Sequence, residues 1–256
     1  MDKQHFRQRI TYRIIVNLAQ DSFRYMKVIT KNSTAILVFA RSSEEELRHK
    51  KIRRGKSLFD ALTGHVLTEV KKTQLPYFHI NETQQDGVSF GVRFSNAIQM
   101  VFDKGYNRII TVGNDSPHLT HSHIEKAILA LQNEDLVIGP SSDGGFYLMG
   151  LHRNDFNKAN FEKLSWQTSS IRKEVIDMVL PKEKKVFTLN QLSDIDTFFD
   201  VKAMAKSTLR TSRRVLKAIE LILFEHKRND IPISLCLKVV NYSIPFNKGS
   251  PIPSLF

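Results

Sequence analysis

The chain of 256 residues contains one cysteine, Cys236, and few glycines (11) or prolines (8). A single cysteine excludes a disulfide framework and any zinc cluster built on several cysteines, and it fits a reducing compartment. The low glycine and proline content excludes collagen-like chains and disordered chains rich in both. No run approaches the ~18 consecutive apolar residues of a spanning helix, and the charged N-terminus lacks the apolar core of a signal peptide. We expect a soluble cytoplasmic protein without a membrane span.

The net charge of +12 is unevenly distributed along the chain. Residues 1–60 contain 14 Lys and Arg against 6 acidic residues, and residues 201–256 contain 10 against 3, whereas residues 61–200 contain 14 against 17. Basic ends can bind the phosphates of RNA, lipid or a nucleotide, and they can also be solvated surface that keeps a protein soluble. Because the centre is slightly acidic, we expect no nucleic-acid partner.

From residue 34 onward, short apolar runs alternate with longer stretches of helical period. We expect strands at residues 34–40, 78–81, 108–113, 136–138, 146–151 and 185–189, and helices at residues 57–72, 92–104, 122–131 and 170–179. Ser122 and Glu125 have the spacing of a capping box at the start of the third helix. This alternation predicts an α/β fold with a mostly parallel sheet and crossover helices.

Two stretches lie outside this alternation and are expected to be extensions of a core formed by residues 34–206. Residues 1–33 contain an amphipathic pattern and are expected to be helical. Residues 207–256 are basic, begin with a helix around residues 215–224, and then lose their periodicity. We expect the core to fold without this C-terminal extension.

Several common motifs are absent. Gly55-Lys56-Ser57 resembles the end of a P-loop, but Lys50 stands at the position of its first glycine. No G-x-G-x-x-G follows the first expected strand, and no G-x-S-x-G is present, which argues against a nicotinamide-binding fold and a serine hydrolase. A histidine cluster has the spacing of metal ligands, but it lies where a turn enters a helix, so a capping role is favoured. Its members are His118, His121 and His123.

Acidic residues follow two of the expected strands. Asp115 comes directly after the strand at residues 108–113, and Asp194 and Asp196 come after the last strand. Because ligands of open α/β sheets collect beyond the carboxyl ends of the strands, Asp115 is placed to hold a divalent cation, although a turn-capping role is the alternative. We expect one of Asp194 and Asp196 to reach the same crevice while the other caps the following helix.

A turn at Asp143-Gly144-Gly145 separates two further expected strands. Paired glycines allow positive φ and close approach of a ligand, and Asp-Gly is also a strong hairpin signal, so a hairpin can form a wall of the site. The single tryptophan, Trp166, is a candidate stacking surface for a sugar or a base.

Four segments, taken in order, resemble a known family. Their sequences are Gly-Asn-Asp-Ser-Pro, Gly-Pro-Ser-Ser-Asp-Gly-Gly-Phe-Tyr-Leu-Met-Gly-Leu, Ser-Trp-Gln-Thr-Ser and Asp-Ile-Asp-Thr. They are similar to the bacterial GT-A-type family described as arsenosugar-biosynthesis-type glycosyltransferases, which is related to cofactor guanylyltransferases and cytidylyltransferases. The resemblance covers approximately residues 34–206. It implies the GT-A or nucleotide-diphospho-sugar transferase fold, with three layers around a mostly parallel twisted sheet.

The resemblance implies a role for each matching residue. Asp115 and Asp196 match acidic positions that hold a metal, and their oxygen ligands favour Mg²⁺ or Mn²⁺. Asp143 is the candidate catalytic residue, acting as general base on an acceptor hydroxyl, with a turn-forming role as the alternative. The expected acceptor-side loop comprises Gly144, Gly145, Trp166 and Thr168.

The phosphate-binding segment departs from the family pattern. In place of Pro-Gly-x-x-Lys-Thr-Arg-Leu, the chain has three glutamates followed by a basic cluster, and Val92 replaces a glutamate before Arg93. Either the rearranged cluster binds the phosphates, with the glutamates as its partners in the absence of nucleotide, or nucleotide binding has been weakened or lost. The candidate phosphate ligands are Lys50, Lys51, Arg53, Arg54, Lys56 and Arg93. We expect alanine at Arg53, Arg54 and Lys56 to weaken nucleotide binding.

Three functions are compatible with these motifs. The favoured one is a metal-dependent glycosyltransferase that uses a nucleotide-diphospho-sugar donor. The alternatives are a nucleotidyltransferase that acts on a nucleoside triphosphate, and a degenerate GT-A domain that serves as a binding module. The expected partners are therefore a nucleotide sugar or nucleoside triphosphate and an acceptor whose identity the motifs leave open.

Overall fold

The computed structural model describes residues 33–179, 184–207 and 211–229. The strands are β1 (Thr34–Phe39), β2 (Tyr77–Ile80), β3 (Arg108–Val112), β4 (Leu136–Pro140), β5 (Phe146–His152) and β6 (Val186–Thr188). The helices are α2 (Ser43–His49), α3 (Lys56–Lys72), α4 (Phe90–Asp103), α5 (His121–Ala130), the 3₁₀ turn η1 (Arg153–Asp155), α6 (Lys158–Glu162), α7 (Ile171–Val179), α8 (Phe198–Ala205) and α9 (Arg213–Asn229).

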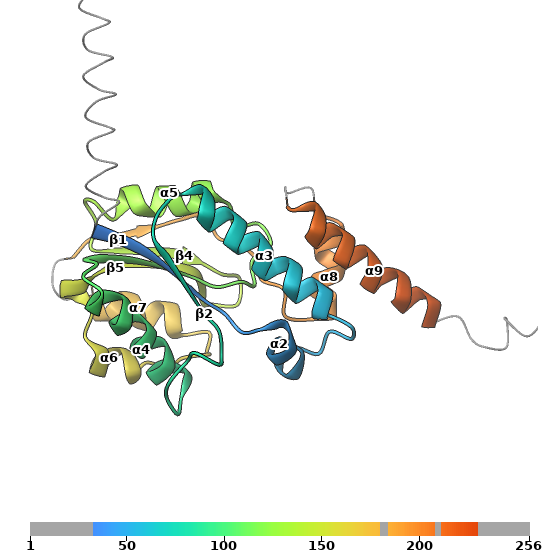
Figure 1. Cartoon of the computed structure of the whole chain (residues 1–256), viewed down its shortest axis with the longest axis horizontal. Coiled ribbons are helices and arrows are strands. Elements are labelled where there is room, and N and C mark those ends of the chain that lie inside the picture. Colours follow the sequence, from blue (N-terminus) through green and yellow to red (C-terminus); the bar gives the residue numbers. More distant parts are fainter. Residues whose placement is uncertain (1–32, 180–183, 208–210, 230–256) are drawn as a thin grey trace, which may run out of the picture.

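The six strands form one sheet in the order β2-β1-β3-β5-β4-β6. β5 runs antiparallel to β3 and β4, whereas the pairs β1–β2, β1–β3 and β4–β6 are parallel. Helices α3 and α5 lie on one face of the sheet, and α4, α6 and α7 lie on the other (Figure 1). The predicted three-layer α/β fold with a mostly parallel sheet is therefore confirmed.

The central strand β1 shows why a continuous apolar run suits this position. Ala35 and Leu37 pack into the apolar cluster that includes α4, whereas Ile36 and Val38 pack into the cluster that includes α3 and α5. All four side chains are fully buried. Because successive side chains of a strand point to opposite faces, a strand covered on both faces needs apolar residues at every position.

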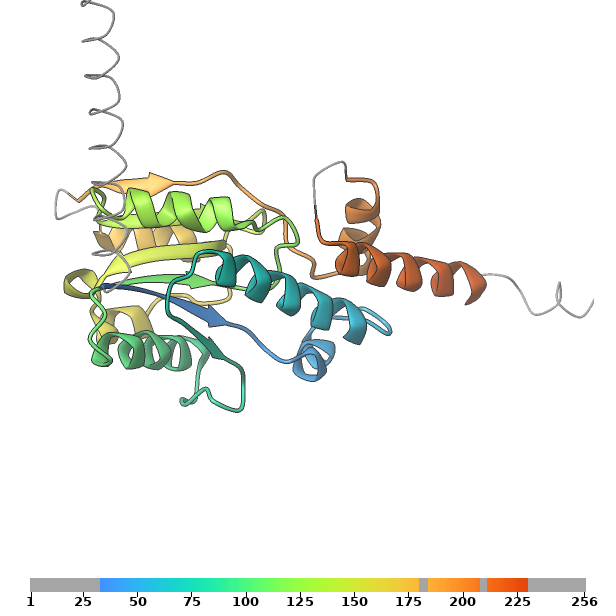
Figure 2. The same cartoon turned by 45° about the horizontal axis from the view of Figure 1, so that its top comes forward.

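A third apolar cluster joins α9 to α3, away from the sheet (Figure 2). Its buried members on α9 are Val215, Ala218, Ile219 and Ile222, and those on α3 are Leu58, Phe59 and Leu62. This packing argues against the expectation that everything after residue 206 is dispensable for folding. The division of the chain at residues 33 and 206 otherwise stays a prediction, and the helix expected within residues 1–33 falls almost wholly outside the described residues.

The start of α5 differs from its prediction. The capping box is formed by Thr120 and His123, because the helix begins one residue before Ser122 and places that serine inside the first turn. The backbone N–H of Thr120 donates to Nδ1 of His123 at 3.2 Å. The prediction of a capping box at Ser122 and Glu125 was wrong, whereas the capping role expected of the histidine cluster is confirmed for His123.

Within the described part of the chain, no helix has the length and apolar character needed to span a membrane.

Candidate functional site

A cavity of about 500 Å³ opens beyond the carboxyl ends of β1, β3 and β4. Its wall includes the segments that leave these strands, the start of β5, the N-terminal turn of α4, the loop before α7 and the segment before α8. Among the expected site residues, its lining includes Lys50, Arg93, Asp115, Asp143, Gly145, Trp166, Thr168 and Asp196. The structure thus brings together residues from four separate motifs at the sheet edge where ligands of α/β folds bind.

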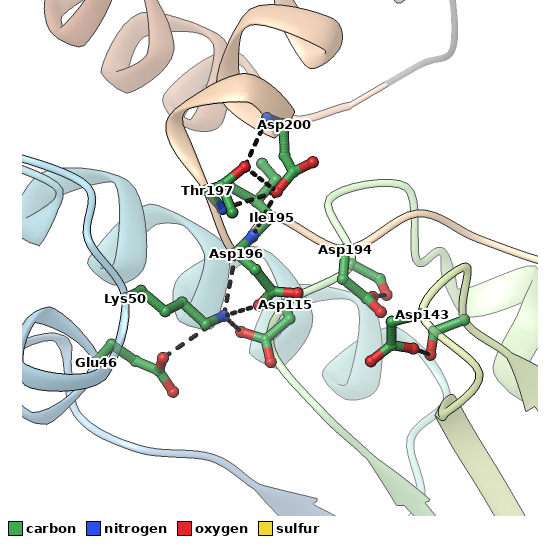
Figure 3. Close-up of polar contacts among 11 residues, drawn as sticks. Glu46, Lys50, Asp115, Asp143, Asp194, Ile195, Asp196, Thr197 and Asp200 are labelled. Carbon is green, nitrogen blue, oxygen red and sulfur yellow. Dashed lines mark hydrogen bonds and ion pairs between the residues drawn. The ribbon is translucent and has the colours of Figure 1, made fainter. Parts of the chain in front are cut away.

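The Lys50 ammonium lies among carboxylates at one end of this cavity (Figure 3). It forms an ion pair with Asp115, lies 3.0 Å from Oδ1 of Asp196, and donates to the backbone carbonyl of Ile195 at 3.1 Å. Oε2 of Glu46 is 3.5 Å from the same nitrogen. The Lys50 side chain is only 10% exposed, so one buried cation connects acidic residues from three segments.

Local structure explains this convergence. Lys50 is the C-cap of α2, and its backbone N–H donates to the carbonyl of Glu46, so the helix places Glu46 one turn before Lys50. The backbone N–H of Ile195 donates to the carbonyl of Asp115 at 3.0 Å and joins the segment after β3 to the segment before α8. The three acidic side chains are therefore held close together before any ligand is considered.

Electrostatics within the group follow from burial and proximity. Burial lowers the pKa of Lys50, but the carboxylates of Asp115, Glu46 and Asp196 outweigh it and leave that pKa above its usual value. Burial and the nearby Asp115 raise the pKa of Glu46, although Lys50 opposes this. Lys50 is therefore a permanent cation at neutral pH, and removing its charge would leave several carboxylates without compensation.

Asp194 and Asp196 both line the cavity, which corrects the expectation that only one of them reaches it. Residues two apart lie on the same side of an extended segment, so both side chains can reach the cavity. Asp194 accepts a hydrogen bond from the Ser116 hydroxyl, and its burial raises its pKa to about 6. The cap of α8 is formed instead by Thr197 and Asp200.

The glycine turn has the geometry of a hairpin and also borders the cavity. Asp143 accepts hydrogen bonds from the Ser141 hydroxyl and, at 2.9 Å, from the backbone N–H of Gly145. Gly144 has a φ of 95°, and a Cβ atom there would lie 2.3 Å from the carbonyl oxygen of Ser169. Gly144 therefore allows the turn to contact the loop before α7, although it does not itself line the cavity.

Aromatic residues form the wall near the N-terminus of α4. The indole N–H of Trp166 donates to the carbonyl of Phe161 at 2.6 Å, and the ring packs against Phe90 and Phe94 with centroid distances of 5.5 and 5.1 Å. A Cβ on Gly91 would lie 2.5 Å from Cδ1 of Trp166, so this glycine allows the ring to lie against the helix. A stacking role for Trp166 stays a prediction.

The other expected phosphate ligands are distributed differently. Lys51, Arg53, Arg54 and Lys56 do not line the cavity. Lys56 pairs with Glu44, and Arg54 lies 2.5 Å from Glu225 on α9. Arg93 does line the cavity, and its Nε donates to Gln85 at 3.2 Å. Of the cluster at residues 50–56, only Lys50 is placed to reach a ligand there.

Sequence reasoning missed Arg41 and Glu46, which also line the cavity. Arg41 follows β1 by two residues, so the rule that ligands collect at the carboxyl ends of strands could have identified it. Glu46 could not be identified in this way, because its place in the cavity depends on the short helix α2, which the sequence pattern did not predict.

The fold is shared with a solved structure. The structure is similar to the crystal structure of a Desulfovibrio desulfuricans G20 protein assigned as a nucleotide-diphospho-sugar transferase, with a TM-score of 0.61, 22% identity, and coverage of 76% of this chain and 95% of that chain. The chain therefore has the nucleotide-diphospho-sugar transferase fold, as the motif resemblance implied.

Sequence comparisons agree with this fold. Residues 56–168 match the profile of a family described as an uncharacterized protein conserved in bacteria, DUF2064. A 2-phospho-L-lactate guanylyltransferase of Methanocaldococcus jannaschii is 28% identical over 148 residues, which cover 55% of this chain and 66% of that protein. The second match agrees with the resemblance to cofactor guanylyltransferases found in the motifs. The aligned region spans just under two thirds of the length of the curated relative.

The arrangement of the side chains shows whether the expected ligands can hold a divalent ion. Asp115 and Asp196, its expected ligands, both contact the Lys50 ammonium, which therefore takes the position between them. Among the residues that the structure describes, no group of three or more His, Cys, Asp or Glu side chains is arranged to hold a metal. In this arrangement the two aspartates do not fit a resident divalent ion.

Proposed function

We propose that the chain is a transferase that binds a nucleotide-activated donor in the cavity at the carboxyl edge of the sheet. The observation that carries this proposal is the convergence of Arg41, Lys50 and Arg93 in the lining of one cavity in a nucleotide-diphospho-sugar transferase fold. Guanidinium and ammonium groups are the usual ligands of phosphate oxygens in proteins. The cavity is also of the size that binds small ligands.

The favoured reaction is glycosyl transfer. The bond between the anomeric carbon and the diphosphate oxygen breaks, and the acceptor hydroxyl oxygen forms the new bond to that carbon. Cations in the cavity stabilise the negative charge that develops on the departing diphosphate. Asp143 borders the cavity and has a free carboxylate oxygen beyond its turn contacts, so it is the candidate base for the acceptor proton.

Nucleotidyl transfer is the second candidate, because the Methanocaldococcus jannaschii relative is a guanylyltransferase. In that reaction an acceptor oxygen attacks the α-phosphorus of a nucleoside triphosphate and pyrophosphate leaves. The same cations would then stabilise charge on the pyrophosphate. Neither reaction is routed here through the divalent ion expected from the sequence, because the Lys50 ammonium lies against both of its expected ligands, Asp115 and Asp196.

Ligand binding and product analysis test this function together. Nucleotide sugars, nucleoside diphosphates and nucleoside triphosphates are screened by thermal shift, where a ligand that binds the native state raises the melting temperature. A stabilising ligand is then incubated with candidate acceptors. Release of nucleoside diphosphate supports glycosyl transfer, and release of pyrophosphate supports nucleotidyl transfer. Stabilisation without turnover favours the binding-module alternative, and no stabilisation by any nucleotide contradicts the proposal.

A further inference from the structure

We infer that the Lys50 ammonium is the resident cation of this site: it occupies the position between Asp115 and Asp196 that a divalent ion would need, and it meets the phosphates of the nucleotide in place of that ion. This inference rests on the proposed function for its second part only. The first part, competition between Lys50 and a divalent ion, follows from the arrangement of the side chains alone.

The coordination of Lys50 resembles that of a bound cation. Three oxygens accept from the ammonium or pair with it closely: a carboxylate oxygen of Asp115, Oδ1 of Asp196 at 3.0 Å and the carbonyl of Ile195 at 3.1 Å. Asp115 and the carbonyl of Ile195 accept hydrogen bonds from the ammonium, which has three N–H donors, and Asp196 forms an ion pair with it. A divalent ion on the same two carboxylates would have to displace the lysine side chain completely.

The surroundings oppose such a displacement. The side chain of Lys50 is 10% exposed, and its Nζ also lies 5.7 Å from the centroid of the Phe59 ring. Oε2 of Glu46 lies 3.5 Å from the ammonium and has no hydrogen-bond partner, so Lys50, together with the weaker effect of Arg41, balances this buried carboxylate. Moving Lys50 away would remove that compensation, which is costly for a buried charge.

One partner of the ammonium can be exchanged for a ligand oxygen. The Asp196 side chain is 48% exposed, whereas Glu46 is nearly fully buried, so Asp196 faces the open part of the cavity. A phosphate oxygen that replaces Asp196 would take over its ion pair with the ammonium. The cavity lining contains five acidic side chains and three cations, so Lys50 is one of the three groups there that can pair with phosphate oxygens.

Manganese binding by matched variants tests the first part. Lys50→Met removes the ammonium and keeps the length of the side chain, whereas Lys51→Met removes the same charge from the neighbouring exposed residue. Isothermal titration with Mn²⁺ alone should show affinity about tenfold or more tighter for Lys50→Met than for the wild type and Lys51→Met. Equal affinity in all three proteins would overturn the inference. If Lys50→Met does not fold, Lys50→Met combined with Glu46→Gln replaces it, since the second change removes a buried carboxylate.

Nucleotide binding with and without metal tests the second part. The wild-type protein should be stabilised by a nucleoside diphosphate to the same extent in EDTA and in Mn²⁺, and Lys50→Met should lose the stabilisation in EDTA and regain part of it in Mn²⁺. Stabilisation of the wild type in Mn²⁺ only would overturn this part. If no nucleotide binds the wild type under either condition, the proposed function fails, while the titration with Mn²⁺ still decides the competition.

Discussion

The cavity edge and the region where α9 packs against α3 differ in which residues they bury: charged side chains are buried at the cavity edge, and apolar side chains are buried beside α9. At the cavity edge, Lys50 and Glu46 are buried and the carboxylates converge on one ammonium. On the α9 side, α3 and α9 bury apolar residues, and the ion pairs Arg54–Glu225 and Lys56–Glu44 stay on the surface. Cations that are close together in the sequence therefore have different surroundings: Lys50 lines the cavity, whereas Arg54 and Lys56 form surface ion pairs.

The largest expected effect in this comparison concerns the apolar contact of α9. A chain that ends at Lys206 lacks Val215, Ile219 and Ile222, which are buried against α3. Burying side chains of this size contributes about 1.5–3 kcal/mol each, so we expect the free energy of unfolding to fall by about 5 kcal/mol or more. Urea unfolding measures the loss.

A second, shorter truncation tests whether any loss of stability comes from α9 itself or from the residues that follow it. A chain that ends at Asn229 keeps the whole helix, so it should retain its midpoint of unfolding far better than the shorter chain. If both truncated chains unfold at the urea concentration of the full-length protein, the contact between α3 and α9 contributes nothing to stability, and residues 207–256 are dispensable as their sequence had suggested.

The expected effect at the cavity edge is smaller and depends on pH. Burial raises the pKa of Asp194 from 3.8 to about 6. A carboxyl whose pKa is higher in the folded state opposes folding once it ionises. Stability should therefore fall as pH rises from about 4 through 6, by roughly 2–3 kcal/mol for a shift of this size.

Asp194→Asn tests this prediction because it keeps the shape of the side chain and removes its titration. Urea unfolding of the wild type and the variant is compared at intervals from pH 4 to pH 7.5. The free-energy difference between the two proteins should grow in favour of the variant as pH rises through 6. A difference that is constant over this range would show that ionisation of Asp194 is not linked to folding.

The fold could be predicted from sequence because its determinants are local or periodic. The apolar run of β1 and the helical period of α3 and α4 each identified an element near its observed bounds. The cavity residues that directly follow strands, Asp115 above all, were predictable because the carboxyl edge of the sheet is where such residues meet.

The centre of the site could not be predicted in the same way. The position of Lys50 depends on the short helix α2 and on the ion pair between Lys50 and Glu46. It also depends on the hydrogen bond between Ile195 and Asp115, which joins segments far apart in the chain. Because the cations at residues 50–56 are close together in the sequence, we expected them to bind phosphate as one group. Tertiary structure separates them, because a charge is buried only where three distant segments supply partners for it.

The smallest expected effect concerns the remaining cations of that group. In the triple variant Arg53→Ala, Arg54→Ala, Lys56→Ala, the surface pairs with Glu225 and Glu44 are lost, and exposed pairs of this kind contribute about 0–1 kcal/mol each. None of the three residues lines the cavity, so we now expect nucleotide affinity to change less than threefold or so, which is within about 0.7 kcal/mol. This reverses the expectation drawn from sequence.

The affinity is measured by titration of the same nucleoside diphosphate into the wild type, the triple variant and Lys50→Met. A loss in the triple variant as large as that in Lys50→Met would mean that the exposed cations move over the phosphates on binding, and that the contrast between the two regions does not hold for the ligand-bound protein.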